Sequence, residues 1–295
     1  MVLLLIFFCA VPFSLRAIDI EITAGAGNFS FDHNETEYLS DENNPLVFKP
    51  GLSPILNAAV SGVTGMVYYR GGFERDFVMR NRLFANAGVD LAYFNIDAGV
   101  FLGLFNSKQE MFNPGLSISM AAQLPGIILL KLNALSSIGG GLSTIGSYTQ
   151  KTGGISIGFW VPYIVCSLNL QTQNFTIKEE ANLLIEDSLV KYFFRADVFT
   201  KNVPYTISID FGYGILKRTH YSQSVIASPL ELVSNALIDE LKFIYLGLKV
   251  DYTVNSSLKI FAKGEIPFYS WASPHMKVNQ HSTLFQMFTG VVLTF

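Results

Sequence analysis

The sequence predicts an all-β protein that crosses a membrane as a transmembrane antiparallel up-and-down β-barrel of about 14 strands, with about 12 as the alternative. Two observations predict this fold. The 295-residue chain is 50% hydrophobic and only 15% charged, and its mean hydropathy of +0.36 is too high for a typical water-soluble protein of this length. Beyond residue 17, apolar and polar positions alternate in segments of about ten residues, separated by Gly, Pro, Asn and Ser.

The first 17 residues form the only stretch that could be mistaken for a membrane-spanning helix, which needs about 20 apolar residues. The stretch from Met1 to Ala17 is a long apolar run followed by Pro12, small residues and a closing alanine. This order is typical of a secretory signal peptide. We therefore expect a signal peptide over residues 1–17 and a single transmembrane β-barrel domain over residues 18–295.

Cysteine content and charge narrow the class further. Cys9 would carry the anchor of a lipoprotein, but Phe7 and Phe8 stand where small residues normally precede a lipidated cysteine. Cleavage after residue 17 leaves Cys166 alone, so burial and hydrogen bonding must stabilise the exported chain without an intramolecular disulfide. The net charge is −3 and the sequence has no strongly basic patch, so it does not indicate a surface that would bind the phosphates of a nucleic acid.

The clearest predicted strand runs from Leu258 to Phe268. Its apolar side chains fall on one face, whereas Lys259, Lys263 and Glu265 fall on the other. One face of such a strand suits lipid and the opposite face suits water. The same split appears in three further segments, Val190 to Lys201, Tyr205 to Gly214 and Ile244 to Tyr252.

The strand count depends on parity, because a barrel with both ends on one side of the membrane needs an even number of strands. The clear segments give an odd number. The strand count becomes even if Pro45 to Leu52 is a short strand followed by a turn through Ser53 to Asn57. A switch in apolar phase between Leu83 and Leu104 predicts another turn near Tyr93 to Asn95. The long inserts then all lie on one side: Asp32 to Asn44, Ile138 to Gly153, Lys178 to Ser188, Thr219 to Glu240 and Ala272 to Ser282.

Charged residues on the polar face of the strands are expected to line the lumen. Side chains of both signs in a low-dielectric surround must pair or stay hydrated, so the lumen is either a salt-bridged plug or a wet passage. A barrel of about 14 strands is wider than side chains easily fill, which favours a passage partly occluded by charged side chains and loops. The predicted lumen-facing residues are Arg70, Glu74, Arg82, Asp90, Asp97, Lys131, Lys191, Arg195, Asp197, Asp210, Lys249, Asp251, Lys259, Lys263 and Glu265.

The chain ends in an alternating segment, Thr283 to Phe295, whose last residue is phenylalanine. This segment resembles the terminal strand signal of bacterial outer-membrane β-barrel proteins, and the architecture of the whole mature chain resembles the small spirochaetal barrels of that class. The resemblance implies a location in the bacterial outer membrane, contact with outer-membrane lipid, and recognition of the Phe295 strand by the barrel assembly machinery.

Two functions remain open at this point. The polar inward face favours a channel or transporter for small solutes, whereas the long inserts suit a surface-exposed interaction protein, adhesin or structural barrel that acts through its outer loops. The sequence identifies neither the solute nor the partner. Two inserts have helical features, because Ser228 to Leu237 begins with a capping box and Lys178 to Leu189 is acidic and permits a helix.

Catalytic groups are sparse. The four histidines, His33, His220, His275 and His281, fall in predicted outer loops, and none belongs to a nucleophile motif. Asp32 with three of these histidines could converge as a metal or hydrolytic site at the rim. Loop histidines are more often simply solvated, so we expect no enzymatic activity, no cofactor and no metal.

Overall fold

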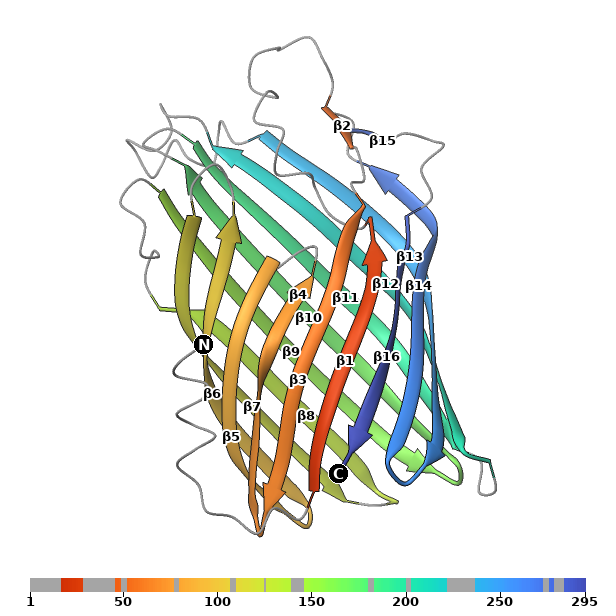
Figure 1. The fold of residues 1–295 in the computed structure, drawn as a ribbon. Helices are drawn as coiled ribbons and strands as arrows, with labels where there is room; N and C mark the ends of the chain where they lie inside the picture. Colours follow the sequence, from red (N-terminus) through yellow and green to blue (C-terminus); the bar gives the residue numbers. More distant parts are fainter. Residues whose placement is uncertain are drawn as a thin grey trace.

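The computed structural model describes residues 17–28, 46–48, 52–76, 80–106, 110–124, 126–138, 146–179, 183–199, 203–221, 237–272, 276–278 and 284–295. Fourteen antiparallel strands close into one barrel, in the order β1-β16-β14-β13-β12-β11-β10-β9-β8-β7-β6-β5-β4-β3 (Figure 1). The predicted all-β barrel and its strand count are therefore confirmed. In the described part of the chain, no helix has the length and apolar character needed to cross a membrane.

The strands differ markedly in length. The barrel strands are β1 (Ala17–Gly27), β3 (Ser53–Thr64), β4 (Val67–Asp76), β5 (Arg80–Leu91), β6 (Phe94–Asn106), β7 (Glu110–Leu124), β8 (Ile128–Ser137), β9 (Gly146–Val161), β10 (Ile164–Glu179), β11 (Leu183–Phe199), β12 (Tyr205–Tyr221), β13 (Leu237–Asn255), β14 (Leu258–Ala272) and β16 (Gln286–Thr294). Two short strands, β2 (Leu46–Phe48) and β15 (Met276–Val278), lie outside the barrel sheet.

The first and last barrel strands close the cylinder. β1 pairs with β16 from Asp19 opposite Thr294 to Gly27 opposite Gln286. Backbone hydrogen bonds in both directions between Ile18 and Phe295 extend this ladder to the end of the chain. Both ends of the barrel sequence therefore lie at one end of the cylinder, as an even strand count requires. This end carries short turns and is called the turn end; the opposite end carries the longer connections and is called the loop end (Figure 1).

Two assignments behind the predicted count of fourteen are wrong. The segment Pro45 to Leu52 is not a barrel strand, since Leu46–Phe48 within it forms β2, which pairs with β15 outside the barrel sheet. The predicted turn through Ser53 to Asn57 is also wrong, because these residues begin β3. Ser53, Pro54 and Asn57 are residue types that favour turns, but here β1 on one side and β4 on the other pair with β3 and override that preference.

Three predicted inserts overlap barrel strands and are shorter than expected. The insert from Thr219 to Glu240 is shortened at both ends, because β12 ends at Tyr221 and β13 begins at Leu237. β9 already begins at Gly146, within the predicted insert from Ile138 to Gly153. The insert from Lys178 to Ser188 is mostly strand, since β10 ends at Glu179 and β11 begins at Leu183, so the helical interpretation of that segment is wrong. The turn predicted near Tyr93 to Asn95 is present one residue earlier, at residues 92–93.

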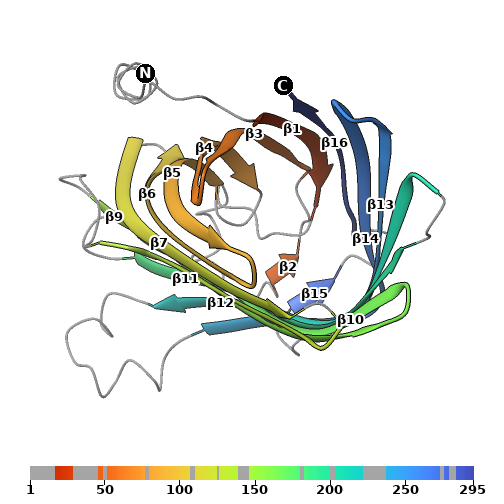
Figure 2. The ribbon, with the colours of Figure 1, turned by 90° about the horizontal axis from the view of Figure 1, so that it is seen from below.

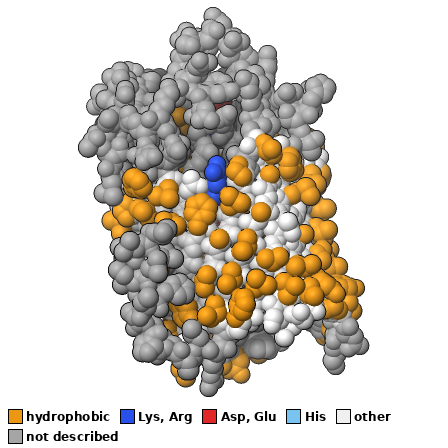
Figure 3. All heavy atoms as spheres, in the orientation of Figure 1, with side chains coloured by type: hydrophobic (Ala, Val, Ile, Leu, Met, Phe, Trp, Pro, Cys, Tyr) orange, Lys and Arg blue, Asp and Glu red, His pale blue; other side chains and the backbone are white. Residues whose placement is uncertain are grey.

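An apolar belt covers the outer wall on the face of the barrel that Figure 3 shows. On β12 the outward positions from Tyr205 to Ile215 are apolar or aromatic, and the next outward residue is Lys217. A tilted strand of about 10 residues crosses a bilayer, so this run is long enough to span one. At the loop-end edge of the belt, Trp271 stacks on Tyr213 with ring centroids 5.8 Å apart, as expected where a wall meets the lipid headgroups.

The wall of the barrel has an uneven height. β9 to β13 are 16 to 19 residues long, whereas β1, β3, β4 and β16 have 9 to 12 residues. The surplus lies at the loop end, because the other end is held by short turns (Figure 1). β2 and β15 form a two-stranded parallel sheet. Figures 1 and 2 place this sheet at the loop end and within the outline of the barrel, over its mouth.

The belt yields a stability prediction. Leu248 faces outward in the middle of the belt and is 49% exposed, so Leu248→Arg should place a charge in hydrocarbon and lower the free energy of unfolding by about 2 to 4 kcal/mol. Urea unfolding of the barrel refolded into phospholipid vesicles measures this change. Ser188→Arg, beyond the loop-end edge of the belt, should cost less than about 1 kcal/mol. Equal losses in the two variants would contradict the position of the belt.

Candidate functional site in the barrel interior

The inner face of the barrel is defined by the two-residue alternation of its strands. On β13, Leu241, Phe243 and Tyr245 are almost fully buried, whereas the outward-facing Leu246 and Leu248 are each 49% exposed. The buried row continues toward the turn end with Asp251. The interior therefore contains both apolar and charged side chains, and they occupy different regions.

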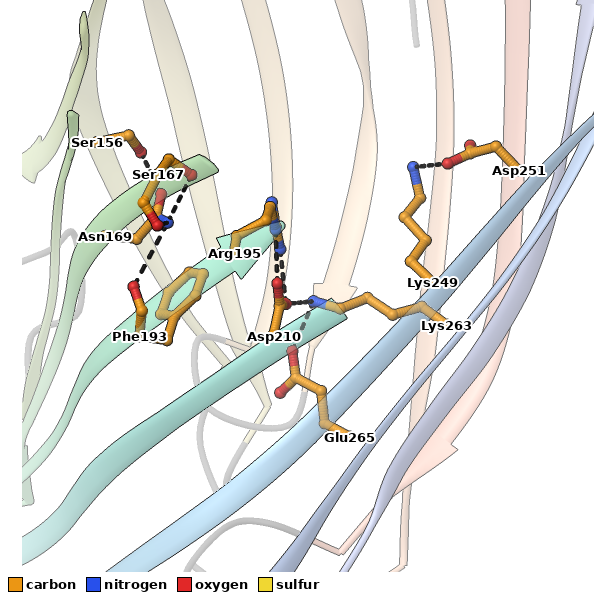
Figure 4. Close-up of polar contacts among 10 residues, drawn as sticks. All are labelled: Ser156, Ser167, Asn169, Phe193, Arg195, Asp210, Lys249, Asp251, Lys263 and Glu265. Atoms are coloured by element: carbon orange, nitrogen blue, oxygen red, sulfur yellow. Dashed lines mark hydrogen bonds and ion pairs between the residues drawn. The ribbon is translucent and has the colours of Figure 1, made fainter. Parts of the chain in front are cut away.

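A five-residue network of ion pairs lies on the inner wall of β11, β12 and β14. Figure 4 shows Arg195, Asp210, Lys263 and Glu265 of this network, and Lys191 is its fifth member. Arg195 binds Asp210 through two hydrogen bonds, Nε to Oδ1 at 2.6 Å and Nη2 to Oδ2 at 2.7 Å. Lys263 lies between the two carboxylates, with its Nζ 2.5 Å from Glu265 Oε1 and 3.9 Å from Asp210 Oδ2. Lys191 Nζ donates to Glu265 Oε2 at 2.5 Å. This network holds three cations and two anions.

The contact between Lys191 and Glu265 establishes which way these side chains point. β11 and β14 are separated by β12 and β13 in the barrel, and neighbouring strands lie about 4.8 Å apart. Two side chains that far apart along the wall can meet only on the concave side, where the wall curves toward them. The five residues therefore project into the space enclosed by the barrel.

A second group of charges lies nearer the turn end of the same wall. The Nζ atoms of Lys249 and Lys259 lie 2.9 Å and 3.0 Å from the two carboxylate oxygens of Asp251. The lysine side chains are 33% and 45% exposed, whereas the carboxylate is 9% exposed. Water therefore reaches the turn-end part of the lumen, and lysines outnumber carboxylates within this group.

The opposite wall carries its own paired charges. Arg70 donates to Glu21 Oε2 at 3.1 Å, and Arg82 pairs with Glu74. Asp97 accepts hydrogen bonds from the Asn86 amide at 2.9 Å and from the Ser119 hydroxyl. Among the described residues, no lysine or arginine forms an ion pair with Asp97.

A cavity of about 360 Å³ lies along this second wall, on the inner face of β4 to β9. Arg70, Glu74, Arg82 and Asp97 line it together with neutral polar side chains and the ring of Tyr68. Its size falls within the range of small-molecule sites, about 300 to 1,000 Å³. The interior is therefore not completely filled by side chains.

Apolar side chains fill part of the interior toward the loop end. Phe193, Leu216, Leu241, Phe243 and Tyr245 form the centre of a buried cluster. Leu189, Ile55 and Leu284 complete it, and Ile55 comes from β3, on the far side of β1 and β16 from β14. A cluster that joins strands from separate parts of the wall must fill the space between them. Packing at Gly214 is tight, since a Cβ atom there would lie 2.0 Å from the Phe243 ring.

One buried ion pair was not predicted from the sequence. Arg218 on β12 binds Asp187 on β11 through two hydrogen bonds of 2.6 and 2.7 Å, and both side chains are only 5–6% exposed. The prediction missed it because Asp187 was assigned to a loop. The register of β11 and β12 places the two residues directly opposite each other, so a longer strand assignment could have found the pair.

Twelve of the predicted lumen-facing residues are among the interacting groups described above. Asp90, Lys131 and Asp197 are different, because none of them forms an ion pair with another described residue. Asp90 and Lys131 are exposed, and Asp197 is half-buried. Asp90 lies next to Leu91, where β5 reaches the turn end.

The predicted rim site cannot be assembled from the described residues. His33, His275 and His281 lie outside them, as do Asp32 and nearly all of the predicted helix from Ser228 to Leu237. His220 was expected in a loop, but it belongs to β12. Within the described ranges, no group of three or more His, Cys, Asp or Glu residues is arranged to hold a metal ion. The predicted signal peptide is likewise outside them, except for Ala17 at the start of β1.

A closed antiparallel barrel with an apolar belt outside and charged side chains inside is a transmembrane β-barrel of the bacterial outer membrane. In lipid, only a closed ladder satisfies every backbone hydrogen bond of a sheet. The turn end then faces the periplasm and the loop end faces the outside.

No protein-family model and no curated protein matches the chain. Among solved structures, the chain is similar to an outer-membrane channel from Pseudomonas putida, with 7% identity and a TM-score of 0.49 over 97% of each chain. It is also similar to a bacterial polysaccharide outer-membrane secretin (10% identity, TM-score 0.45, 94% of this chain and 97% of that one). A third is an anion-selective porin from Comamonas acidovorans (8% identity, TM-score 0.43, 96% and 99%). Because these values are low, the class given above rests on this chain's own strand pairing and belt.

The ion-pair network yields a second stability prediction. Glu265 neutralises both Lys191 and Lys263, whose side chains are 13% and 17% exposed. Glu265→Gln should therefore lower the free energy of unfolding by about 3 kcal/mol, since it leaves buried cations without their carboxylate. Urea titration in detergent micelles measures the loss. Lys131→Gln removes an exposed charge and should change stability by less than about 0.5 kcal/mol. If the two variants unfold at the same urea concentration, the network does not stabilise the barrel.

Proposed function

We propose that this protein is an outer-membrane channel for small solutes, with a wet periplasmic half and an outer half closed by the apolar cluster. The observation that carries the proposal is the charged inner wall. Side chains such as Lys249 and Lys259 remain 33% and 45% exposed although they point into the barrel. A barrel that served only as a membrane anchor would gain stability from an apolar filling, because buried ion pairs seldom outperform well-packed hydrophobic residues.

The closed outer half supports a channel that opens by rearrangement rather than a permanently open pore. Leu241 and Phe175, near the outer ends of β13 and β10, have no exposed surface. Gln150 on β9 is equally buried. The apolar cluster is the part of the interior that a solute would have to displace, since water and polar solutes are excluded from a packed apolar constriction.

The proposal predicts the effect of opening the cluster. Phe243→Ala removes a fully buried ring from its centre and should raise the single-channel conductance of the refolded protein in planar bilayers, because a water-sized path replaces the ring. Phe268→Ala is the matched control, since this ring faces outward in the belt and is 60% exposed. It should leave the conductance unchanged.

Two outcomes would count against the channel. The first is that neither the natural sequence nor Phe243→Ala conducts above the background of the bilayer. The second is that both phenylalanine variants raise conductance equally, because the change would then reflect a loosened wall rather than an opened cluster. Migration of unheated samples on gels shows whether each variant is a folded barrel.

We further propose that the chain is exported by a signal peptide over residues 1–17 and inserted by the barrel assembly machinery through the β16 strand. Phe295 supports this, because it is 73% exposed at the end of the closing strand, where its side chain is available to a partner.

The proposed assembly route predicts a defect confined to cells. Phe295→Ala should reduce the amount of folded barrel in the outer membrane, because a recognition contact is lost, while the same variant should refold normally from urea into detergent. Heat-modifiable migration on gels reports both quantities. Normal assembly in cells would show that Phe295 is not recognised, and failed refolding in detergent would show that its role is structural.

A further inference from the structure

The cavity on the inner face of β4 to β9 has features of a built binding site. It is about 360 Å³ in volume, and its lining includes two arginines and two carboxylates, Arg70, Arg82, Glu74 and Asp97. Neither arginine carries a free charge, because Arg70 is paired with Glu21 and Arg82 with Glu74. The opposite wall differs, since its network of Lys191, Arg195, Lys263, Asp210 and Glu265 has an excess of positive charge. Because both of its arginines are paired, the cavity offers a free anion little net attraction.

Hydrogen-bonding groups in the cavity remain unused. The Nε of Arg82 is buried and has no acceptor, although the other end of the guanidinium pairs with Glu74. Asn133 and Thr152 also line the cavity, and neither side chain hydrogen-bonds to another described residue as donor. The cavity thus combines unused donors and acceptors. A buried N–H without a partner costs free energy until a ligand or water accepts from it.

The two arginines are held in place by aromatic rings. The guanidinium carbon of Arg70 lies 5.4 Å from the centre of the Phe84 ring, and that of Arg82 lies 5.9 Å from the centre of the Phe101 ring. Gly115 makes room for Phe101, since a Cβ atom there would come within 2.1 Å of the ring. Such stacking orients the guanidinium before any ligand arrives, which reduces the entropy lost on binding.

We propose that this cavity binds a neutral polyhydroxylated solute of about monosaccharide size. A hydroxyl group both donates and accepts a hydrogen bond, which matches a lining that offers Arg82 Nε–H as a donor, the Asp97 carboxylate as an acceptor and the Asn133 amide as both. The ring of Tyr68 adds an apolar face for the C–H groups of a sugar. This inference rests on the proposed channel function, because the solute reaches the cavity through the lumen, and it adds the class of solute.

The test is a binding measurement on the processed chain in lipid nanodiscs, where both mouths of the barrel meet the solution. Saturation-transfer NMR with D-glucose should give a saturable signal. Arg82→Lys keeps the charge that Glu74 needs but removes the Nε–H, and it should weaken glucose binding by a factor on the order of 10. Arg75→Lys on the neighbouring strand β4 is the matched control, because Arg75 faces outward from the barrel, and it should bind glucose normally.

A second variant keeps the proposal testable if Arg82→Lys fails to fold. Thr152→Val removes one hydroxyl from the lining without changing any charge, and it should also weaken glucose binding. No saturable glucose signal, or equal binding in all variants, overturns the proposal. Stronger binding of gluconate or choline than of glucose overturns it too, because the site would then select an ion.

Conductance measured on the same preparations separates this inference from the proposed function. A protein that conducts but does not bind glucose has the channel function without this solute class. A protein that binds glucose but never conducts, even as Phe243→Ala, has the binding site while the channel proposal fails.

Discussion

The pairing of β1 with β16 is the constraint on which the rest of this structure depends. A sheet in hydrocarbon cannot leave backbone N–H and C=O groups without partners, so the two ends of the sequence must meet. They do so down to Ile18 and Phe295, which exchange backbone hydrogen bonds at the turn end. Closure forces an even number of strands, and it encloses an interior that lipid cannot enter and that the side chains alone must fill or leave wet.

The way in which side chains fill the interior changes along the barrel axis. Toward the loop end, an apolar cluster that includes the rings of Phe243 and Tyr245 fills part of the interior, and the ion pair of Asp187 and Arg218 is buried on the same strands. Elsewhere along the wall, inward charges are neutralised by neighbours on adjacent or nearby strands. Unpaired charge is costly where the dielectric is low, so the exposed lysines are found where water enters, and two buried carboxylates, Asp210 and Glu265, each bind two cations.

Alternation alone predicts the strands that have one apolar and one polar face, such as β12 and β14. It fails on β3, where Ala, Ser, Gly and Asn give little contrast between the faces and the first residues resemble a turn. It also fails where the partner is distant in sequence: Asp187 looks like part of an acidic loop until Arg218, 31 residues away, neutralises it. The apolar cluster was missed because the inward face of β13 becomes apolar at Leu241, Phe243 and Tyr245 while the outward face carries Lys242, which breaks the expected pattern of polar inside and apolar outside. The cavity was beyond prediction, because it depends on how Phe101 packs over Gly115.

The unequal lengths of the strands give the barrel an oblique rim. β9 to β13 extend beyond the headgroups as a continuous hydrogen-bonded sheet. The part of the wall that contains β1, β3 and β16 ends closer to the membrane. A large object that approaches from the extracellular medium, such as an antibody or a phage fibre, therefore meets strand backbone farther from the membrane along β9 to β13 than along β1, β3 and β16. The edge formed by the described strands is asymmetric, although the cylinder beneath it is closed all the way round.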